Sequence, residues 1–196
     1  MQVKKQRRSN ASRSHAMREA LIAAGRRLFV EKGYAETSTP EIVAAANVTR
    51  GALYHHFEDK AALFRAVIVT ESEHVADAIN IATRGCADAV GALDTGTDAY
   101  LDAMTVPGRT RLLLIDGPAA LGRKAMDEID RETSGGTIVV GLSGATGRPP
   151  DARMEVQGRL LSAAFERAAL DIADGADPVT YRTELKRMLA ETCGRA

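Results

Sequence analysis

The segment TSTPEIVAAANVTRGALYHHFEDK, residues 37–60, decides the fold of this chain. Ser38 stands three residues before Glu41 with Pro40 between them, which is the pattern of a capped helix start. A turn of about three residues, Asn47–Thr49, then separates this helix from a second short one. Two short helices joined in this way have the layout of a helix-turn-helix.

Helical periodicity extends on both sides of this segment. Residues 14–32 carry apolar side chains three and four positions apart, and Gly33 suits the position just past the helix end. Asp59 precedes a further helix of the same kind. Residues 1–13 place five Lys and Arg among polar residues with nothing to bury, so we expect a disordered basic arm. Such an arm either only solubilises the chain or touches a phosphate backbone or a minor groove.

The helical pattern weakens beyond residue 80. Residues 109–132 predict two helices bent near Gly117 and Pro118. Residues 134–150 are first apolar and then Gly-rich, and they fit either a poor helix or a strand. Apolar periodicity returns in two last helices, at about 151–174 and 178–192.

The formal net charge of zero conceals an uneven distribution. Residues 1–65 carry 12 Lys and Arg against 6 Asp and Glu, whereas residues 66–196 carry 14 against 20. This distribution indicates an anion-binding part attached to a part that avoids anions. Cys86 and Cys193 are too far apart to suggest a disulfide framework. No run is apolar enough for a membrane span, so we expect a cytoplasmic protein without a membrane partner.

Metal and catalytic sites are not predicted. His55 and His56 are adjacent, and neighbours on a helix point about 100° apart, so they cannot hold one ion together. The stretch around Ser143 lacks the spacing of a nucleophile elbow, and every histidine precedes it. One alternative stays open, a small nucleotide-binding enzyme that uses the Gly-rich segment 135–147, although this segment lacks the G-x-G-x-x-G spacing. No cofactor is expected.

A helical arrangement of residues 50–57 separates a buried face from an outward one. Leu53 and Phe57, four residues apart, form the buried face. The outward face presents a guanidinium, a phenol, an imidazole and two very small residues: Arg50, Tyr54, His55, Gly51 and Ala52. Small residues permit close approach of the backbone and polar tips donate hydrogen bonds, so this face suits a DNA major groove with phosphates held at its edges.

The run Gly33–Val67 resembles the DNA-binding signature of the tetracycline-repressor (TetR) family. After its turn, that signature has the pattern G-x-L-Y-x-H-F-x-x-K-x-x-L, which is matched without a gap by Gly51, Leu53, Tyr54, His56, Phe57, Lys60 and Leu63. The stretch LLLIDGPAALG resembles a segment of actinobacterial-type members. The resemblance implies an all-α, TetR-like fold. It has a three-helix helix-turn-helix domain at residues 14–74 and a helical effector-binding and dimerisation domain at residues 75–196.

The resemblance also implies roles for individual residues. Base edges would be contacted by residues at the start of the second short helix: Arg50, Gly51, Ala52 and His55. Phosphates would be held by Ser38, Thr39, Tyr54, His56 and Lys60. Pro40 departs from the commoner residues at its position and supplies no side-chain hydrogen bond there. The family architecture makes residues 134–150 an irregular helix-to-loop connection.

We therefore expect a homodimeric, ligand-responsive transcription regulator, a repressor that binds a palindromic operator in double-stranded DNA and responds to an unknown small-molecule effector. Its two DNA-binding domains must lie one helical turn, or a multiple of it, apart. The expected dimer interface consists of Leu161, Ala164, Phe165, Ala168, Leu185 and Leu189. The expected effector cavity is lined by Leu101, Met104, Leu113, Met126 and Phe165, with Asp116, Arg109 or Arg111 as polar anchors.

Overall fold

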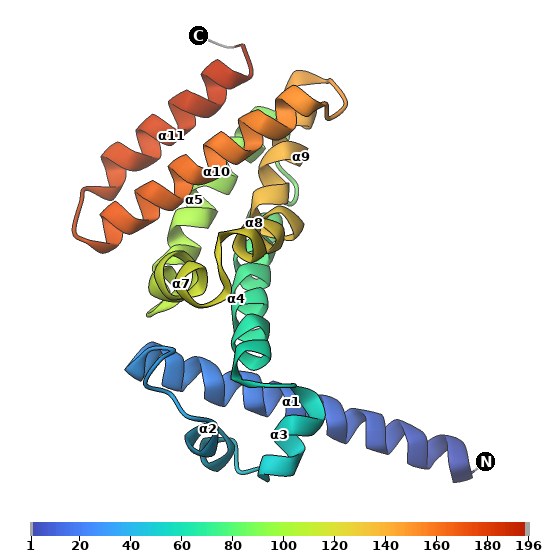
Figure 1. Cartoon of the computed structure of the whole chain (residues 1–196). Helices are drawn as coiled ribbons and strands as arrows, with labels where there is room; N and C mark the ends of the chain where they lie inside the picture. Colours follow the sequence, from blue (N-terminus) through green and yellow to red (C-terminus); the bar gives the residue numbers. More distant parts are fainter. Residues whose placement is uncertain (1, 195–196) are drawn as a thin grey trace.

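The computed structural model describes residues 2–194, with side chains from residue 12 onward. Every regular element in that range is a helix (Figure 1). The head of the molecule consists of α1 (Gln2–Lys32), α2 (Thr39–Ala45) and α3 (Arg50–His56), and α4 (Lys60–Thr83) rises from it into the rest of the protein. The predicted all-α class is confirmed.

The larger part of the protein, α5–α11, follows α4 in the chain. The long helices α10 and α11 lie side by side at the end farthest from the head, and α5, α8 and α9 lie between them and α4 (Figure 1). The bounds of its elements are α5 (Ala89–Met104), α6 (Arg109–Arg111), the π-helical η1 (Leu112–Asp116), α7 (Gly117–Leu121), α8 (Arg123–Glu132), α9 (Ser134–Thr146), α10 (Ala152–Ala173) and α11 (Pro178–Thr192).

Polar side chains define where the helices of the head begin. Ser38 caps α2 and forms the predicted capping box with Glu41. Thr49 and Asp59 cap α3 and α4 by accepting hydrogen bonds from backbone N–H groups of the first turn. The turn between α2 and α3 contains Asn47 at φ +53°, a left-handed conformation that asparagine tolerates. The path of the chain through the head is thus set by local signals.

An aromatic cluster packs the head against α4. Phe29 of α1 meets Phe64 of α4 edge to face, with ring centroids 4.9 Å apart, and Tyr34 packs on Phe64 at 4.7 Å. Leu53 of α3 is fully buried in the same core. Burial of a leucine contributes about 2 kcal/mol, so the inner face of α3 is held by packing.

The first helix begins earlier than the sequence suggested. The structure starts α1 at Gln2, whereas we expected a helix from Ser14 and a disordered arm over residues 1–13. No Gly or Pro interrupts residues 2–24, and Lys, Arg, Gln and Ala are good helix formers. The helix therefore extends back through the basic segment; Met1 lies outside the described residues.

Residues 134–146 form the helix α9, so the helix alternative is confirmed for them, and neither the strand nor the irregular connection implied by the family architecture is present there. Glycine is a poor helix former, but here it permits close packing. A Cβ at Gly141 would lie 2.5 Å from Leu93 of α5, and one at Gly158 of α10 would lie 2.7 Å from Val139. The nucleotide-binding alternative is wrong, because it requires a strand before the Gly-rich turn and residues 2–194 contain none.

The bend after α6 takes the form of a π-helical segment. In η1 the N–H of Gly117 donates to the carbonyl oxygen of Leu112, five residues earlier. Pro118, which follows, has no N–H with which to continue an α-helical ladder. The break between the helices predicted over residues 109–132 lies at Gly122, which has φ +84°, and not at Gly117.

A buried ion-pair network joins the head to the larger part. The Glu71 side chain of α4 is only 3% exposed, and its carboxylate lies 2.9 Å from Nε of Arg26 of α1 and 3.0 Å from Nε of Arg109 of α6. Burial raises the pKa of Glu71, but the hydrogen bonds from the two arginines outweigh it and leave the pKa below its ordinary value. Three helices are thus held at one carboxylate.

The network lies close to the domain boundary that we expected between residues 74 and 75. That boundary falls inside α4, which runs unbroken from the head to Thr83. One hydrophobic core also contains residues from both sides of it, such as Phe29 of the head and Leu112 of η1. The head and the larger part are therefore continuous in both helix and core.

Removal of the Glu71 carboxylate is expected to destabilise the protein. Glu71→Ala leaves the buried Arg109 cation without its partner, which costs about 3–5 kcal/mol. Glu73→Ala, on the exposed side of the same helix, costs less than about 0.5 kcal/mol. Because the folded pKa of Glu71 is depressed, its contribution is present above the unfolded pKa of about 4.3 and is lost as the pH falls through the folded value.

Urea unfolding of both variants and of the wild type at pH 7 and pH 3 measures this difference. Glu71→Ala should unfold at a lower urea concentration at pH 7, and its deficit should shrink at pH 3. Equal midpoints for the two variants at pH 7 would contradict the structural role of the network.

Candidate nucleic-acid interface

The exposed face of α3 holds the residues that were expected to contact bases. Leu53 and Phe57 point into the core, as their spacing predicted. On the outward side Arg50, Gly51 and His55 are exposed and Ala52 is half-buried. The face therefore combines the polar side chains of Arg50 and His55 with Gly51 and Ala52, whose side chains are a hydrogen atom and a methyl group.

Three predicted contact residues converge at the amino-terminal ends of α2 and α3. The guanidinium carbon of Arg50 lies 5.5 Å from the centre of the Tyr54 ring. Side-chain hydrogen bonds with Thr39, and then with Arg50, lower the pKa of the Tyr54 phenol. A hydroxyl, a phenol and a guanidinium thus gather at one exposed place, and together they form a set of donors suited to phosphate oxygens.

Gly51 is not required to be glycine by the fold. Its φ lies outside the left-handed region, and a Cβ there would meet only Thr49 Oγ1, at 3.9 Å. Gly33, at the end of α1, differs because it has φ +84° and a Cβ there would lie 2.9 Å from Arg111. The absence of a side chain at Gly51 therefore leaves the backbone of α3 open to close approach by a binding partner.

Ser38 and Thr39 use their hydroxyls differently. The Ser38 hydroxyl donates to the Glu41 carboxylate at 2.7 Å, and Lys32 approaches the other oxygen of that carboxylate at 2.6 Å. Hydrogen bonds from Lys32 and Ser38 lower the pKa of Glu41 to about 2. Ser38 is thus engaged at the start of α2, and Thr39 is the residue whose hydroxyl meets the α3 surface.

Lys60 is turned into the protein. Its ammonium donates to the carbonyl oxygens of Tyr34 at 2.9 Å, Thr37 at 3.0 Å and Ala35 at 3.4 Å. These contacts use all three N–H donors of the ammonium group. The geometry does not offer Lys60 for the phosphate contact that we expected, because Lys60 instead holds the loop that leads into α2.

One cation near the α3 surface was not predicted as a contact. α1 brings Arg18 over the ring of Phe57, with the guanidinium carbon 5.5 Å from the ring centre. Burial, His55 and Arg18 together lower the pKa of His56, which is therefore a neutral hydrogen-bonding group near pH 7. Only the packing of α1 on α3 brings Arg18 there, so no local sequence pattern signals it.

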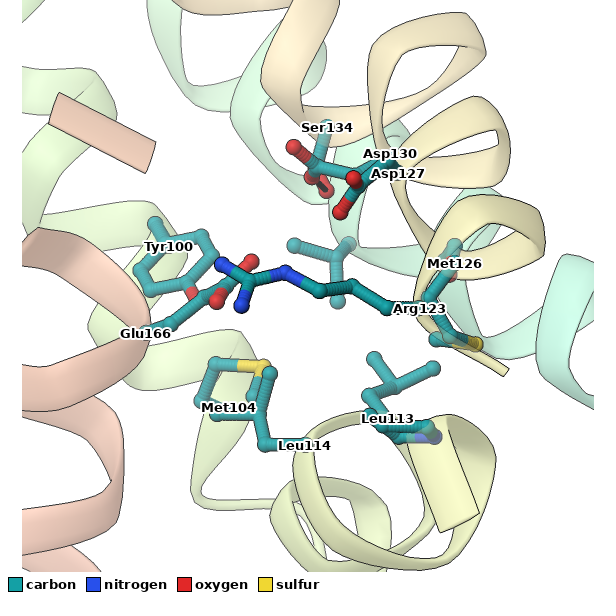
Figure 2. Close-up of a pocket in the computed structure, with 13 residues that line it drawn as sticks. Tyr100, Met104, Leu113, Leu114, Arg123, Met126, Asp127, Asp130, Ser134 and Glu166 are labelled. Atoms are coloured by element: carbon teal, nitrogen blue, oxygen red, sulfur yellow. Dashed lines mark hydrogen bonds between the residues drawn. The ribbon is translucent and has the colours of Figure 1, made fainter. Parts of the chain in front are cut away.

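A cavity of about 280 Å³ lies in the larger part of the protein, among α4, α5, η1, α8 and α10 (Figure 2). Of the residues expected in an effector cavity, Met104, Leu113 and Met126 line it. Leu101 and the predicted anchor Arg111 line a second cavity of about 410 Å³ next to α6. The first cavity also contains polar residues that sequence analysis missed, because a charged face of a helix reads the same whether it meets solvent or a cavity: Arg123, Asp127 and Asp130 of α8, with Tyr100 of α5 and Glu166 of α10.

The remaining residues expected in the cavity are engaged elsewhere. Arg109 is paired with Glu71. Asp116 lies 3.2 Å from Arg111, its only charged partner in the described chain. Phe165 packs edge to face on Tyr100 behind the cavity wall. These three contribute to the surrounding structure and not to the cavity surface.

The residues expected at a dimer interface are buried within the chain itself. They belong to one hydrophobic cluster between α10 and α11. Ala164 is half-buried at its edge, and the other five are buried: Leu161, Phe165, Ala168, Leu185 and Leu189. Burial within one chain leaves these side chains little surface to offer a partner. The outward side of the two helices also carries large apolar residues, namely Val156, Leu160, Val179 and Met188.

The described residues offer neither a metal site nor a membrane span. No group of three or more His, Cys, Asp or Glu side chains in that range is placed to hold a metal ion. No helix in the same range is long and apolar enough to cross a bilayer.

Comparison with known proteins points to one family for both parts of the chain. Residues 21–67 match the family described as "Bacterial regulatory proteins, tetR family". Residues 90–193 match the family described as "Tetracyclin repressor-like, C-terminal domain". The first match covers most of the head, and the second covers most of the larger part.

Curated relatives are similar over limited stretches. The transcriptional repressor BepR of Brucella suis is 45% identical over 51 residues, which are 26% of this chain and 24% of that protein. The TetC protein of transposon Tn10 from Escherichia coli is 29% identical over 120 residues, which are 61% of this chain and 60% of that protein. The chain thus aligns with between about a quarter and three fifths of these relatives' lengths.

Solved structures are similar over nearly the whole chain. A TetR-family transcriptional regulator from Pectobacterium atrosepticum is 27% identical with a TM-score of 0.66, covering 92% of this chain and 93% of that one. A regulator of the same family from a Shewanella species has a TM-score of 0.71 at 21% identity, covering 91% and 96%. At that identity the second likeness shows the fold alone.

The inward geometry of Lys60 predicts a loss of stability when its charge is removed. Lys60→Met leaves three backbone carbonyls without their donor, and charge-assisted hydrogen bonds of this kind contribute about 2 kcal/mol. Arg65→Met, an exposed change on the same helix, should alter stability by less than about 0.5 kcal/mol. Thermal melting of both variants checks this, and a Lys60→Met variant as stable as the wild type would show that the loop does not need the ammonium.

Proposed function

Because the chain belongs to the tetracycline-repressor family, it is a DNA-binding transcription regulator, and we propose that it is a ligand-responsive repressor that binds a palindromic operator as a homodimer. Residues 14–74 would contact DNA, and residues 75–196 would bind the effector and the partner subunit. The observation that carries this proposal is the exposed face of α3, with Thr39 of α2 gathered beside Tyr54 and Arg50.

In this proposal α3 lies in the major groove. Arg50, at the exposed first turn, has the fork geometry that pairs with guanine O6 and N7, and the small residues after it let the helix approach closely. Thr39, Tyr54 and His56 hold phosphates at the edges of the groove. The excess of basic residues in residues 1–65 attracts this end of the molecule to DNA, while the acidic remainder is repelled.

Two copies would pair through the outward sides of α10 and α11. Leu160 and Val179 are 67% and 68% exposed there, and Val156 adds to the same surface. Val156 and Leu160 lie one helical turn apart on α10, and Val179 lies near the turn that joins the two helices, so apolar side chains are exposed along the length of this helix pair. A symmetric pair uses the same patch on both copies and holds two heads at one separation, as a palindromic operator requires.

The cavity of about 280 Å³ is the proposed effector site. Ser72, which lines the cavity, follows Glu71 directly on α4. Leu113, which also lines it, belongs to η1, the segment that continues from α6 and its Arg109. An occupant that moves either element therefore acts on the network that also holds α1 through Arg26. Such an effector changes DNA binding only if it has different affinities for two arrangements of the head.

Similar structures support a response to small molecules. RolR, which is 20% identical with a TM-score of 0.67, was solved in complex with resorcinol. LfrR from Mycobacterium smegmatis, 18% identical with a TM-score of 0.61, was solved in complex with proflavine. These ligands belong to those proteins, and the chemistry of the present cavity must be argued from its own residues.

The first test of the proposal separates stability from DNA binding at one residue. Gly51→Ala should stabilise the protein by about 0.5–1 kcal/mol, because alanine is the better helix former and the new Cβ meets nothing closer than 3.9 Å. The same methyl group would stand between α3 and the floor of the groove. We expect affinity to fall by about tenfold or more for a duplex that the wild type selects from a random pool.

Arg50→Ala is the matched comparison for this test. It should cost about 1–3 kcal/mol on the selected duplex and less on a scrambled one, because it removes a base contact. Thermal melting and fluorescence anisotropy with both duplexes give the required values. A Gly51→Ala variant that binds the selected duplex like the wild type would place α3 outside the groove.

The second test concerns assembly. Leu160→Asp introduces a charge into the proposed interface and should yield single chains, whereas Val140→Asp on α9, equally exposed but outside the interface, should leave dimers intact. Sedimentation velocity at micromolar concentration distinguishes a mass near 20.9 kDa from one near twice that value. A wild-type protein that sediments as a single chain would overturn the proposed homodimer.

A further inference from the structure

The cavity of about 280 Å³ carries more acidic than basic groups. Glu166 of α10 and Asp127 and Asp130 of α8 supply carboxylates, and Arg123 of α8 is the single cation among the described residues that line the cavity. Figure 2 shows the Arg123 side chain crossing the cavity, with its guanidinium directed at Tyr100 and Glu166. The interior thus already holds one positive group opposite its carboxylates.

Two polar groups that face the cavity lack a partner. Within residues 12–194, neither the Glu166 carboxylate nor the Tyr100 hydroxyl makes a hydrogen bond or an ion pair, and burial acts on both. Asp130 differs, because its oxygens accept hydrogen bonds from Ser134 at 3.1 Å and Ser162 at 2.7 Å. The oxygens of both groups are open to the cavity, since neither group is among the fully buried unpaired atoms of the described chain, so a bound molecule can pair with them directly.

Part of the cavity wall is apolar. Met104 lies beside Tyr100 and Glu166, and Leu113 and Leu114 continue this apolar part, while Asp127 and Asp130 lie at the other edge of the cavity (Figure 2). The Tyr100 ring is held in place by an edge-to-face contact with Phe165, with centroids 5.2 Å apart. A molecule in this cavity therefore meets aliphatic and thioether groups next to a fixed aromatic ring and an unpaired carboxylate.

We propose that the effector is an organic cation, an apolar body that carries one protonated amine or similar nitrogen group, which binds between Glu166 and the ring of Tyr100. In the unliganded protein Arg123 occupies the place of that cation, and the effector displaces it to solvent. This inference rests on the proposed role of the cavity as the effector site and adds the chemical class of the ligand.

Arg123 is placed so that it can leave the cavity. It is an exposed residue in the first turn of α8, and no ion pair within the described residues holds its guanidinium. Gly122 before it has φ +84° and open surroundings. An arginine that returns to water regains its hydration, whereas the incoming ammonium gains a carboxylate that had no close partner.

The charge of Glu166 links effector binding to pH. Burial, Asp130 and Asp127 raise the pKa of Glu166 to about 7 against the opposing influence of Arg123, and burial keeps the facing Tyr100 of α5 uncharged by raising its pKa as well. A bound cation lowers the pKa of Glu166, so binding releases a proton at pH 6 and affinity rises with pH. We expect a rise of roughly tenfold between pH 6 and pH 8 for an amine that is protonated throughout.

An anionic effector is the contrasting hypothesis. It would pair with Arg123, but it would also meet Glu166, Asp127 and Asp130, whose charges repel it. The two hypotheses predict opposite effects of removing the Arg123 charge. Loss of that charge weakens the binding of an anion, and it strengthens the binding of a cation that competes with Arg123.

Three molecules that share the same apolar group and differ in the charge of their polar end test the proposal: 4-phenylbutylammonium, 4-phenylbutan-1-ol and 4-phenylbutyrate. Titration calorimetry measures their affinity for the full chain as wild type, Arg123→Met and Glu166→Gln at pH 6 and pH 8. Of the three probes, the ammonium should bind the wild type most tightly. Its affinity for Arg123→Met should be higher than its affinity for the wild type. Glu166→Gln should weaken ammonium binding by roughly tenfold and remove the pH dependence.

Several results would overturn this inference. In the wild type, these are a carboxylate that binds more tightly than the ammonium, an ammonium that binds no better than the alcohol, or no binding of any of the three. A further one is an Arg123→Met variant that binds the ammonium more weakly than the wild type does. A wild-type protein that selects no duplex from a random pool contradicts the proposed function instead. That selection uses none of the three molecules, so the two failures are distinguishable.

Discussion

The carboxylate of Glu71 is the constraint on which the arrangement of the molecule depends. It lies on α4 and is held by Arg26 from α1 and Arg109 from α6. A buried charge does not lose its partner without a large cost, so these three elements cannot move independently. Packing adds to the constraint, because a Cβ at Gly108 would lie 2.4 Å from Val30, which places the turn before α6 directly on α1. The orientation of the head and the shape of the cavity wall therefore belong to one connected structure.

The head could be predicted from sequence because its signals are local. Ser38, Thr49 and Asp59 start helices through hydrogen bonds from backbone N–H groups three residues away, and the spacing of Leu53 and Phe57 gives the buried side of α3. Lys60 shows where this inference ends. Its partners are backbone carbonyls 23 to 26 residues earlier in the chain, so a signature that matches the lysine does not disclose what it contacts.

The larger part was predicted less completely because non-local packing decides it. Apolar spacing located α10 and α11, but it could not choose between their two apolar sides: Leu161 is 4% exposed and its neighbour Leu160 is 67% exposed. The Gly-rich composition of α9 left a poor helix or a strand open, because the close packing of Gly141 on Leu93 is not visible in the local sequence. Met104, Leu113 and Met126 of the cavity were predicted from their apolar character, but its polar residues were not, since only the packing of α5, α8 and α10 turns them toward one space.

The unbroken course of α4 makes this helix a lever. Its 24 residues contain neither Pro nor Gly and form a rod about 36 Å long. A tilt of about 5° around the far end displaces the head by about 3 Å, which is close to the rise of about 3.4 Å per nucleotide along a DNA strand. In a symmetric pair the two displacements are opposite and add. In the proposed homodimer, a tilt of this size would therefore move two recognition helices out of step with an operator of fixed spacing.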